Sequence, residues 1–173
     1  MAVKAQNNVR ITSYYDGKDE KSYYLTWDIK TGKSVIYSWN GTQHKYVAFS
    51  INLPAQPVPG AKGNIMFDAY YDAKDGTSYY LAWDTKTGKS VQYSWSGSAH
   101  GYVAFTINLP ENPLPNATGD IMMKAYYDPT DNKSYYVVYD TNGGKSIIYS
   151  WNGGEHKYAP LTINLPDRPL EGK

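Results

Sequence analysis

The stretch Ser78–Trp95, which reads SYYLAWDTKTGKSVQYSW, decides the fold. Each half of it places apolar or aromatic residues at every second position, which is the pattern of a half-buried β-strand. These positions are Tyr79, Leu81 and Trp83 in the first half, and Val91, Tyr93 and Trp95 in the second. Between the halves, Thr85–Lys89 predicts a tight hairpin turn, because Gly88 can adopt a positive φ.

The same hairpin occurs three times in the chain. The motif Tyr-Tyr-Asp begins at positions 14, 70 and 126, which is a constant step of 56 residues. The copies therefore run over 8–63, 64–119 and 120–173. Of the 19 tyrosines, Tyr139 alone lies outside the common register, where the other copies have Trp27 and Trp83.

Each copy adds one strand before the hairpin and one after it. In the second copy these are Ile65–Tyr71 and Tyr102–Leu109, and no window has a helical period. Pro160 lies inside the last strand of the third copy, which places that strand at a sheet edge or makes it start late. We therefore expect an all-β chain, residues 1–173, that forms a single domain of three repeats.

Three repeats of four strands predict an arrangement about a pseudo-threefold axis, in which the sheets cover one another's apolar faces. We place a β-trefoil first. The alternatives are a β-prism and propeller-like blades. A propeller needs at least about four blades, so a chain with three would have to form a homodimer.

The composition excludes several classes of protein. The chain has no cysteine, which rules out disulfide scaffolds, thiol nucleophiles and zinc–thiolate sites. A net charge of +1 argues against nucleic-acid or membrane-surface partners, and no apolar run is long enough to insert into a membrane. Residues 1–7 lack the apolar core of a signal peptide. We expect a cytoplasmic protein, with release that needs no signal peptide as an alternative.

Catalysis and metal binding both have weaker support than binding of another molecule. No nucleophile elbow, Walker loop, dinucleotide fingerprint or zinc-protease motif is present. Three near-equal copies favour repeated binding over one active site, so we expect no enzyme activity and no cofactor. The histidines could meet on a threefold axis around zinc, and the acidic pairs could bind calcium. A loop histidine and a turn-capping aspartate are the simpler interpretations, so we predict no metal site.

Carbohydrate binding accounts for more of the composition. A sugar needs an aromatic plate and a few fixed polar groups, and each copy offers such a set near its loops. The sets are Asp16, Asp19, Trp39, Asn40 and His44; Asp72, Asp75, Trp95, Ser96 and His100; and Asp128, Asp131, Trp151, Asn152 and His156. We predict a multivalent lectin with one equivalent site per repeat, directed at glycans on cell surfaces or glycoproteins.

Two other interpretations stay open. Trp39, Trp95 and Trp151 alternate with apolar residues, so they could belong to the core, as we expect for Trp27 and Trp83. Adjacent tyrosines point to opposite faces of a strand, so we expect one of each pair to face outward. A surface so rich in tyrosine also suits a protein-binding or structural module, such as an inhibitor or toxin component.

The second copy resembles a known family of sugar-binding proteins. Its stretch from Ser78 to Gly97 is similar to the blade pattern of fucose-binding propeller lectins, which run an aromatic strand, a polar turn and a strand ending near Trp-x-Gly. The resemblance covers about half of each repeat. The arginine and glutamate with which such lectins hold the sugar have no match in this sequence.

Overall fold

The computed structural model describes residues 7–171 of the chain. The segment considered for a signal peptide falls mostly on residues 1–6, which lie outside the described part. Twelve strands follow one another in the order β1 (Val9–Asp16), β2 (Lys21–Asp28), β3 (Ser34–Asn40), β4 (Lys45–Ala48), β5 (Ile65–Asp72), β6 (Thr77–Asp84), β7 (Ser90–Ser96), β8 (Gly101–Ala104), β9 (Ile121–Asp128), β10 (Lys133–Asp140), β11 (Ser146–Asn152) and β12 (Lys157–Pro160).

The all-β class and the repeated four-stranded unit are confirmed. The described chain has no helix, and its strands form three antiparallel four-stranded sheets of similar size, in keeping with a threefold repeat. We call them sheet one (β1–β4), sheet two (β5–β8) and sheet three (β9–β12). Gly88 takes a φ of 75° in the predicted hairpin turn. Pro160 is the last residue of β12, an edge strand, as expected.

The last strand of each repeat is shorter than predicted. In sheet two it ends at Ala104 rather than Leu109. Gln92 of β7 still accepts a hydrogen bond from the Phe105 amide, at 2.8 Å, but its own amide donates to the side-chain oxygen of Asn108, at 2.7 Å. The Asn108 side chain thus replaces a strand backbone and ends the ladder. Asn52 and Asn164 do the same in the other repeats.

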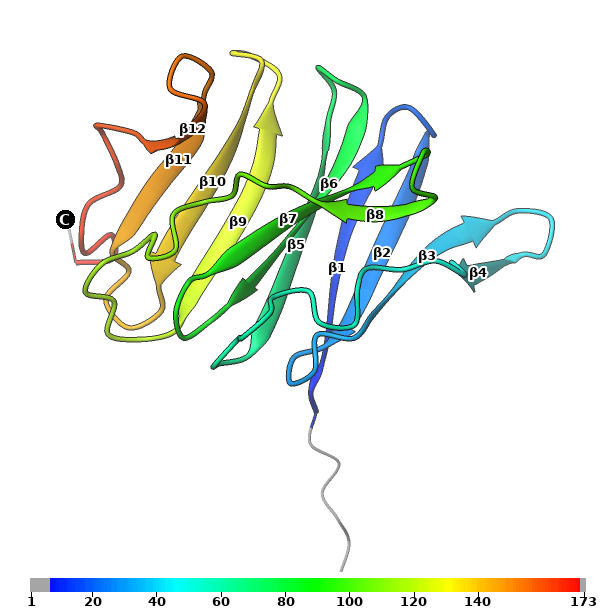
Figure 1. Ribbon diagram of the computed structural model, residues 1–173, viewed down its shortest axis with the longest axis horizontal. Coiled ribbons are helices and arrows are strands. Elements are labelled where there is room, and N and C mark those ends of the chain that lie inside the picture. The colour runs from blue at the N-terminus through cyan, green and yellow to red at the C-terminus, as the bar shows by residue number, and fades with distance from the viewer. Residues whose placement is uncertain (1–6, 172–173) are drawn as a thin grey trace, which may run out of the picture.

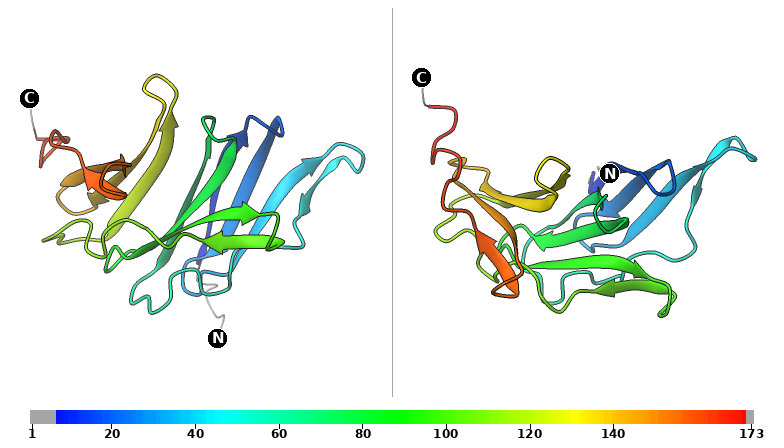
Figure 2. Two further views of the ribbon diagram at one scale, coloured as in Figure 1. Left: turned by 45° about the horizontal axis from the view of Figure 1, so that its top comes forward. Right: turned by 90° about the horizontal axis from the view of Figure 1, so that it is seen from above.

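The three sheets stack in series (Figure 1). Every described strand pair lies inside one repeat, and the sheets pack mainly through their first strands, β1 on β5 and β5 on β9. Figure 2 shows sheet two between the other sheets in both views. A β-trefoil joins strands of different repeats in a common barrel, so the propeller-like alternative describes this series of separate sheets more closely.

Two hydrophobic clusters fill the spaces between neighbouring sheets. In the first, Leu25 and Trp27 of sheet one pack with Phe67 and Tyr80 of sheet two. In the second, Leu81 and Trp83 belong to sheet two, and the facing residues come from sheet three. The buried indoles of Trp27 and Trp83 donate hydrogen bonds to the carbonyls of the next sheet, at 3.0 and 2.9 Å. The expectation that these tryptophans belong to the core is confirmed.

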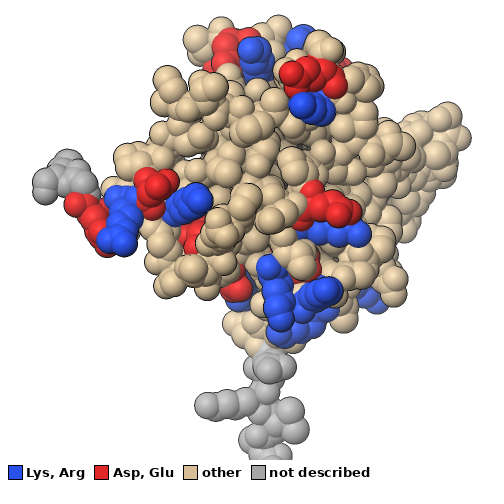
Figure 3. All heavy atoms as spheres, turned by 60° about the vertical axis from the view of Figure 1, so that its left-hand side comes forward, with Lys and Arg blue, Asp and Glu red and all other residues tan. Residues whose placement is uncertain are grey.

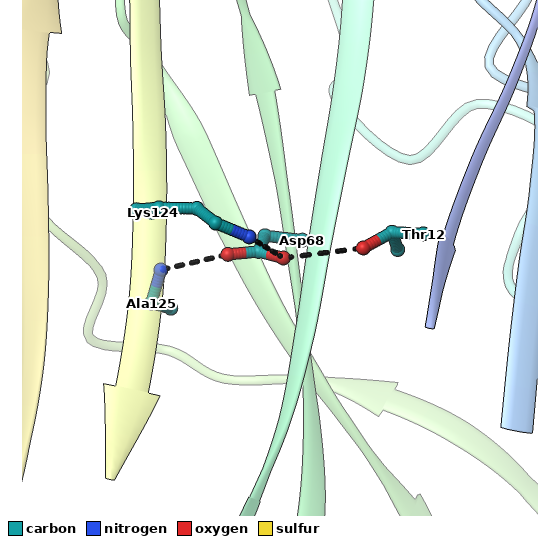
Figure 4. Close-up of polar contacts among 4 residues, drawn as sticks. All are labelled: Thr12, Asp68, Lys124 and Ala125. Atoms are coloured by element: carbon teal, nitrogen blue, oxygen red, sulfur yellow. Dashed lines mark hydrogen bonds and ion pairs between the residues drawn. The ribbon is translucent and has the colours of Figure 1, made fainter. Parts of the chain in front are cut away.

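A buried carboxylate links the first strands of all three sheets. On the face of the molecule shown in Figure 3, charged side chains lie in separate groups among uncharged residues. Asp68 of β5 is buried and accepts hydrogen bonds from Ala125 N at 2.8 Å and Thr12 Oγ1 at 3.4 Å, and it pairs with Lys124 Nζ at 3.2 Å (Figure 4). Asp68 therefore connects β5 to β1 on one side and to β9 on the other.

The described part of the chain contains no helix with the length and apolar character needed to cross a membrane.

Candidate functional site

An aromatic cluster stands at the tip of each third strand. Trp95 of β7 lies opposite Tyr102 of β8 in the ladder, and their ring centroids are 5.3 Å apart in an edge-to-face arrangement. His100 packs edge-to-face on the same indole, at 5.5 Å. The equivalent clusters are Trp39, His44 and Tyr46, and Trp151, His156 and Tyr158.

These tryptophans are plates on the surface rather than core residues. The exposed fractions of Trp39, Trp95 and Trp151 are 46%, 45% and 41%. The adjoining histidines all have a positive φ, between 49° and 54°. A positive φ is uncommon for residues other than glycine, and it recurs here at the same loop position. The loop thus holds each imidazole against its indole in the same way three times.

The polar residue that follows each tryptophan holds the loop in shape. Asn40 Oδ1 accepts a hydrogen bond from Gln43 N at 3.0 Å, and Asn152 Oδ1 accepts one from Gly154 N at 3.0 Å. Ser96 Oγ does the same for Ala99 N at 3.3 Å. Their oxygens are thus committed to the turn, which is the usual use of Asn and Ser in loops.

The predicted aspartates cap the turn between the first two strands of each repeat. Asp16 accepts hydrogen bonds from Lys18 N and Asp19 N, at 2.9 and 3.1 Å. Asp72 Oδ1 and Asp128 Oδ1 accept the corresponding bond, from Lys74 N and Thr130 N. These bonds are the turn-capping that was the simpler interpretation for the aspartates.

The second aspartate of each turn fixes a tyrosine hydroxyl. Tyr23 donates to Asp19 Oδ2 at 2.6 Å, and the later copies pair Tyr79 with Asp75 and Tyr135 with Asp131. The bond to the Asp131 carboxylate raises the pKa of Tyr135 to about 12, because a negative neighbour disfavours the phenolate. The hydroxyl therefore stays protonated and the two side chains stay paired at neutral pH.

A hollow between sheets one and two brings some of the predicted residues together. It has a volume of about 760 Å³, and its lining includes Asp16 and Asp19 of the first repeat with Trp95 and His100 of the second. The predicted sets had joined aspartates and tryptophan within one repeat. The structure instead joins the aspartates of one repeat to the aromatic cluster of the next, because neighbouring sheets stack face to face. We call this hollow the inter-sheet pocket.

Buried and half-buried tyrosines line the inter-sheet pocket, and the sequence alone had not indicated that they belong to a site. Tyr14 OH lies 2.5 Å from Tyr80 OH, and Tyr80 packs edge-to-face on Tyr102. Burial raises the pKa of Tyr14 to about 12, against the opposing effect of its hydrogen bond to Tyr80. Ser78 Oγ donates to Asp16 Oδ2 across the two sheets at 2.6 Å. The sequence signal that could have identified these tyrosines is their recurrence at the same position of every repeat.

The next pair of sheets repeats the same contacts. Tyr70 OH lies 2.6 Å from Tyr136 OH, and Ser134 Oγ donates to Asp72 Oδ2 at 2.7 Å. Gln92 replaces Ile36 of the first repeat; its Nε2 donates a hydrogen bond to Tyr136 OH at 2.8 Å, and its Oε1 accepts one from Tyr158 OH at 2.7 Å. The polar framework around the inter-sheet pocket thus occurs twice within the described chain.

A second hollow, of about 770 Å³, lies on the side of sheet one that no other sheet covers. Its lining includes Ser22, Tyr24, Trp39 and Tyr46. These residues are the first-repeat equivalents of Ser78, Tyr80, Trp95 and Tyr102, which line the inter-sheet pocket. We call this hollow the open half-pocket, because it has the aromatic side of the inter-sheet pocket without the aspartates.

No group of three His, Asp or Glu side chains comes together as metal ligands within residues 7–171.

Comparison with known proteins gives only distant structural likenesses. No protein-family model matches the chain, and no curated protein is significantly similar in sequence. Among solved structures, that of a luciferin-regenerating enzyme is similar with a TM-score of 0.48 and 14% sequence identity. The likeness covers 94% of this chain and 49% of that one, so this chain spans about half its length. At this level of similarity no activity, ligand or partner carries over.

Proposed function

We propose that the protein is a multivalent carbohydrate-binding lectin without catalytic activity, which binds glycans on cell surfaces or glycoproteins. The observation that carries the proposal is the exposed tryptophan plate beside fixed polar groups in the inter-sheet pocket. Trp95 is 45% exposed at the rim, and Asp16 and His100 share the lining. Aromatic faces pack on the C–H patches of a sugar ring, while carboxylate and imidazole groups bond its hydroxyls.

Pre-organisation of the pocket supports the same proposal. The Asp16 carboxylate is held by turn amides, and the Asp19 carboxylate is held by the Tyr23 hydroxyl. The hydroxyls of Tyr14 and Tyr80 hold each other, so few side chains would lose conformational freedom on binding. A hollow of about 760 Å³ falls within the usual range for small-ligand sites. The polar contacts around the pocket recur between sheets two and three. A second binding site there would raise affinity for a glycan-covered surface through effective concentration.

The test is glycan binding by the full chain and by a plate-deficient variant. We expect red-cell agglutination that free monosaccharides inhibit, and retention of specific sugars on a glycan array. In the variant Trp95→Ala with Trp151→Ala, loss of two plates is expected to weaken binding at least about tenfold, as truncation of a tryptophan hot spot does.

Two controls make the result specific. Trp95→Phe with Trp151→Phe keeps an aromatic face and is expected to retain much of the binding. Val103→Ala removes an exposed apolar side chain that lines neither hollow, and it is expected to change nothing. An empty array together with no agglutination contradicts the lectin proposal, and the tyrosine-rich surface is then better tested for protein partners.

A further inference from the structure

The series of sheets ends on two faces that no other sheet covers within residues 7–171. On sheet one, the face turned away from sheet two carries Val9, Ile11, Tyr24, Tyr37 and Tyr46, which we call the first face. On sheet three and the segment after it, Tyr126, Val137, Tyr139, Leu165 and Leu170 form the last face. Their equivalents in the other repeats all contribute to the two clusters between sheets.

The first face exposes residues whose equivalents are buried. Val9 and Ile11 are 56% and 65% exposed, whereas Ile65 of sheet two is 4% exposed, and Phe67 3%. In sheet three the same two positions, Ile121 and Met123, are 3% and 2% exposed. The first face therefore exposes apolar side chains at positions that sheets two and three bury against the preceding sheet. Contiguous exposed apolar surface marks an interaction site.

The last face shows the same contrast from the opposite side. Leu170 is 99% exposed, whereas its equivalents Val58 and Leu114 are 3% and 1% exposed. Leu165 is 52% exposed, although Leu109 is buried at 6%. Figure 3 brings this end of the molecule forward and shows a broad uncharged surface. The last face is thus the kind of surface that sheets one and two bury against a following sheet.

The hydrogen bonds between neighbouring sheets point to the same two faces. They recur at equivalent residues of both sheet–sheet contacts, and a third set of equivalent residues lies at the two ends of the series. Tyr93 OH donates to the Pro57 carbonyl, and Tyr149 OH donates to the Pro113 carbonyl, both at 2.6 Å. The third equivalent pair is Tyr37 with Pro169, one near each end of the series. Two further pairs follow from the contacts already described: Tyr126 with Tyr24, and Asp128 with Ser22. In each pair one residue belongs to sheet one, and the other belongs to sheet three or to the segment after it.

We propose that two copies of the chain associate with the last face of each on the first face of the other, which closes a ring of six sheets. One chain cannot bring its own two faces together across only three sheets, since closed propellers have about four to eight blades. Two copies give six, whereas three would give nine. The two contacts are related by a twofold axis, so the assembly is closed and has no further free face.

The partner chain of such a dimer would also complete the open half-pocket. The half-pocket presents Ser22, Trp39 and Tyr46, and the last face of the second copy would bring Asp128 and Asp131 to it. This arrangement reproduces the inter-sheet pocket, in which Asp16 and Asp19 face Trp95. Association of two chains depends on apolar burial and on matching hydrogen-bonding groups, so it is expected whether or not the pockets bind glycans.

The test is the mass of the full chain in solution, by size-exclusion chromatography with light scattering over a range of concentrations. We expect twice the 19.5 kDa of one chain. Ile11→Glu places a charge in the first face and Leu170→Glu places one in the last face, and each variant is expected to be a monomer. Val103→Glu is the control, because Val103 is 44% exposed on sheet two, both of whose faces are already covered, and it is expected to stay a dimer.

Mixing the two monomeric variants tests the pairing of unlike faces. A mixed pair joins the intact last face of Ile11→Glu to the intact first face of Leu170→Glu, so heterodimers are expected to form, more weakly than the wild-type dimer. Circular dichroism of each variant shows whether it keeps its sheets. A wild-type monomer, a larger or open-ended assembly, or a dimer that only one of the two substitutions disrupts would overturn the proposal.

Discussion

Removal of the Asp68 carboxylate tests how neighbouring sheets are held together. In Asp68→Ala, the amide of Ala125 loses its 2.8 Å acceptor, Lys124 loses its ion pair and Thr12 loses a long contact. The three losses differ in kind, because the amide is a buried donor whereas the Lys124 side chain is 68% exposed. We therefore expect loss of the Ala125 N hydrogen bond to account for most of the lost stability.

The magnitude follows from the surroundings of each partner. An unpaired buried amide costs about 1–3 kcal/mol. An ion pair with an exposed lysine contributes about 0–1 kcal/mol, since water screens the charge. A hydroxyl contact at 3.4 Å is near the limit of hydrogen bonding and adds about 0.5 kcal/mol at most. We expect Asp68→Ala to lower the free energy of unfolding by about 1–4 kcal/mol, with a fall in Tm on the order of 10 °C.

The assay is urea unfolding followed by tryptophan fluorescence and circular dichroism. Lys124→Ala is the matched control and is expected to cost less than about 1 kcal/mol. Asp68→Asn is expected to lie between the two, because its side-chain oxygen can still accept from Ala125 N. Equal costs for Lys124→Ala and Asp68→Ala would refute a dominant role of the Ala125 N hydrogen bond. A change in stability of less than about 0.5 kcal/mol in Asp68→Ala would refute it too.

Two further predictions concern the turns and the tyrosines. Gly88 and Gly60 both have a φ of 75°, but an added Cβ would lie 2.8 Å from Pro113 at Gly88 and would contact nothing at Gly60. We expect Gly60→Ala to cost about 1 kcal/mol of backbone strain in urea unfolding and Gly88→Ala about 1–3 kcal/mol more; equal costs would contradict the proline contact. Burial raises the pKa of Tyr14 to about 12, so above about pH 10 the folded chain keeps a proton that the unfolded chain releases. The free energy of unfolding is therefore expected to fall as pH rises through this range. Urea titrations at each pH, together with tyrosinate absorbance, measure this change. A free energy of unfolding that stays constant from about pH 9 to 12 would show the prediction to be wrong.

The local elements could be predicted from the sequence because their signals lie within one repeat. The alternation around Leu81 and the glycine at position 88 specify a hairpin without reference to any neighbour. The early end of β8 could not be predicted in this way. It depends on the Asn108 side chain reaching Gln92, a contact between residues that lie 16 apart in the sequence.

The site was only partly predictable for a related reason. The sequence identified Trp95 and Asp16 as candidates, but the constant step of 56 residues gives every repeat the same residue types. Alternation shows which residues share a face, and it does not show which repeat covers that face. For the same reason, one tyrosine of each pair was expected to face outward, whereas Tyr80 is buried because sheet two is covered on both sides.

Pairing of strands only within a repeat also has a consequence for how the chain folds and grows. Each sheet can form its backbone hydrogen bonds from residues close in sequence, so contact order stays low for a β protein. The packing of faces and the hydrogen bonds between sheets wait for the next repeat. Solenoid arrays are similar, because their stability is approximately a sum of units and nearest-neighbour terms. Duplication of a whole repeat would thus lengthen the series by one unit and one interface, without disturbing the strand register of the units already present.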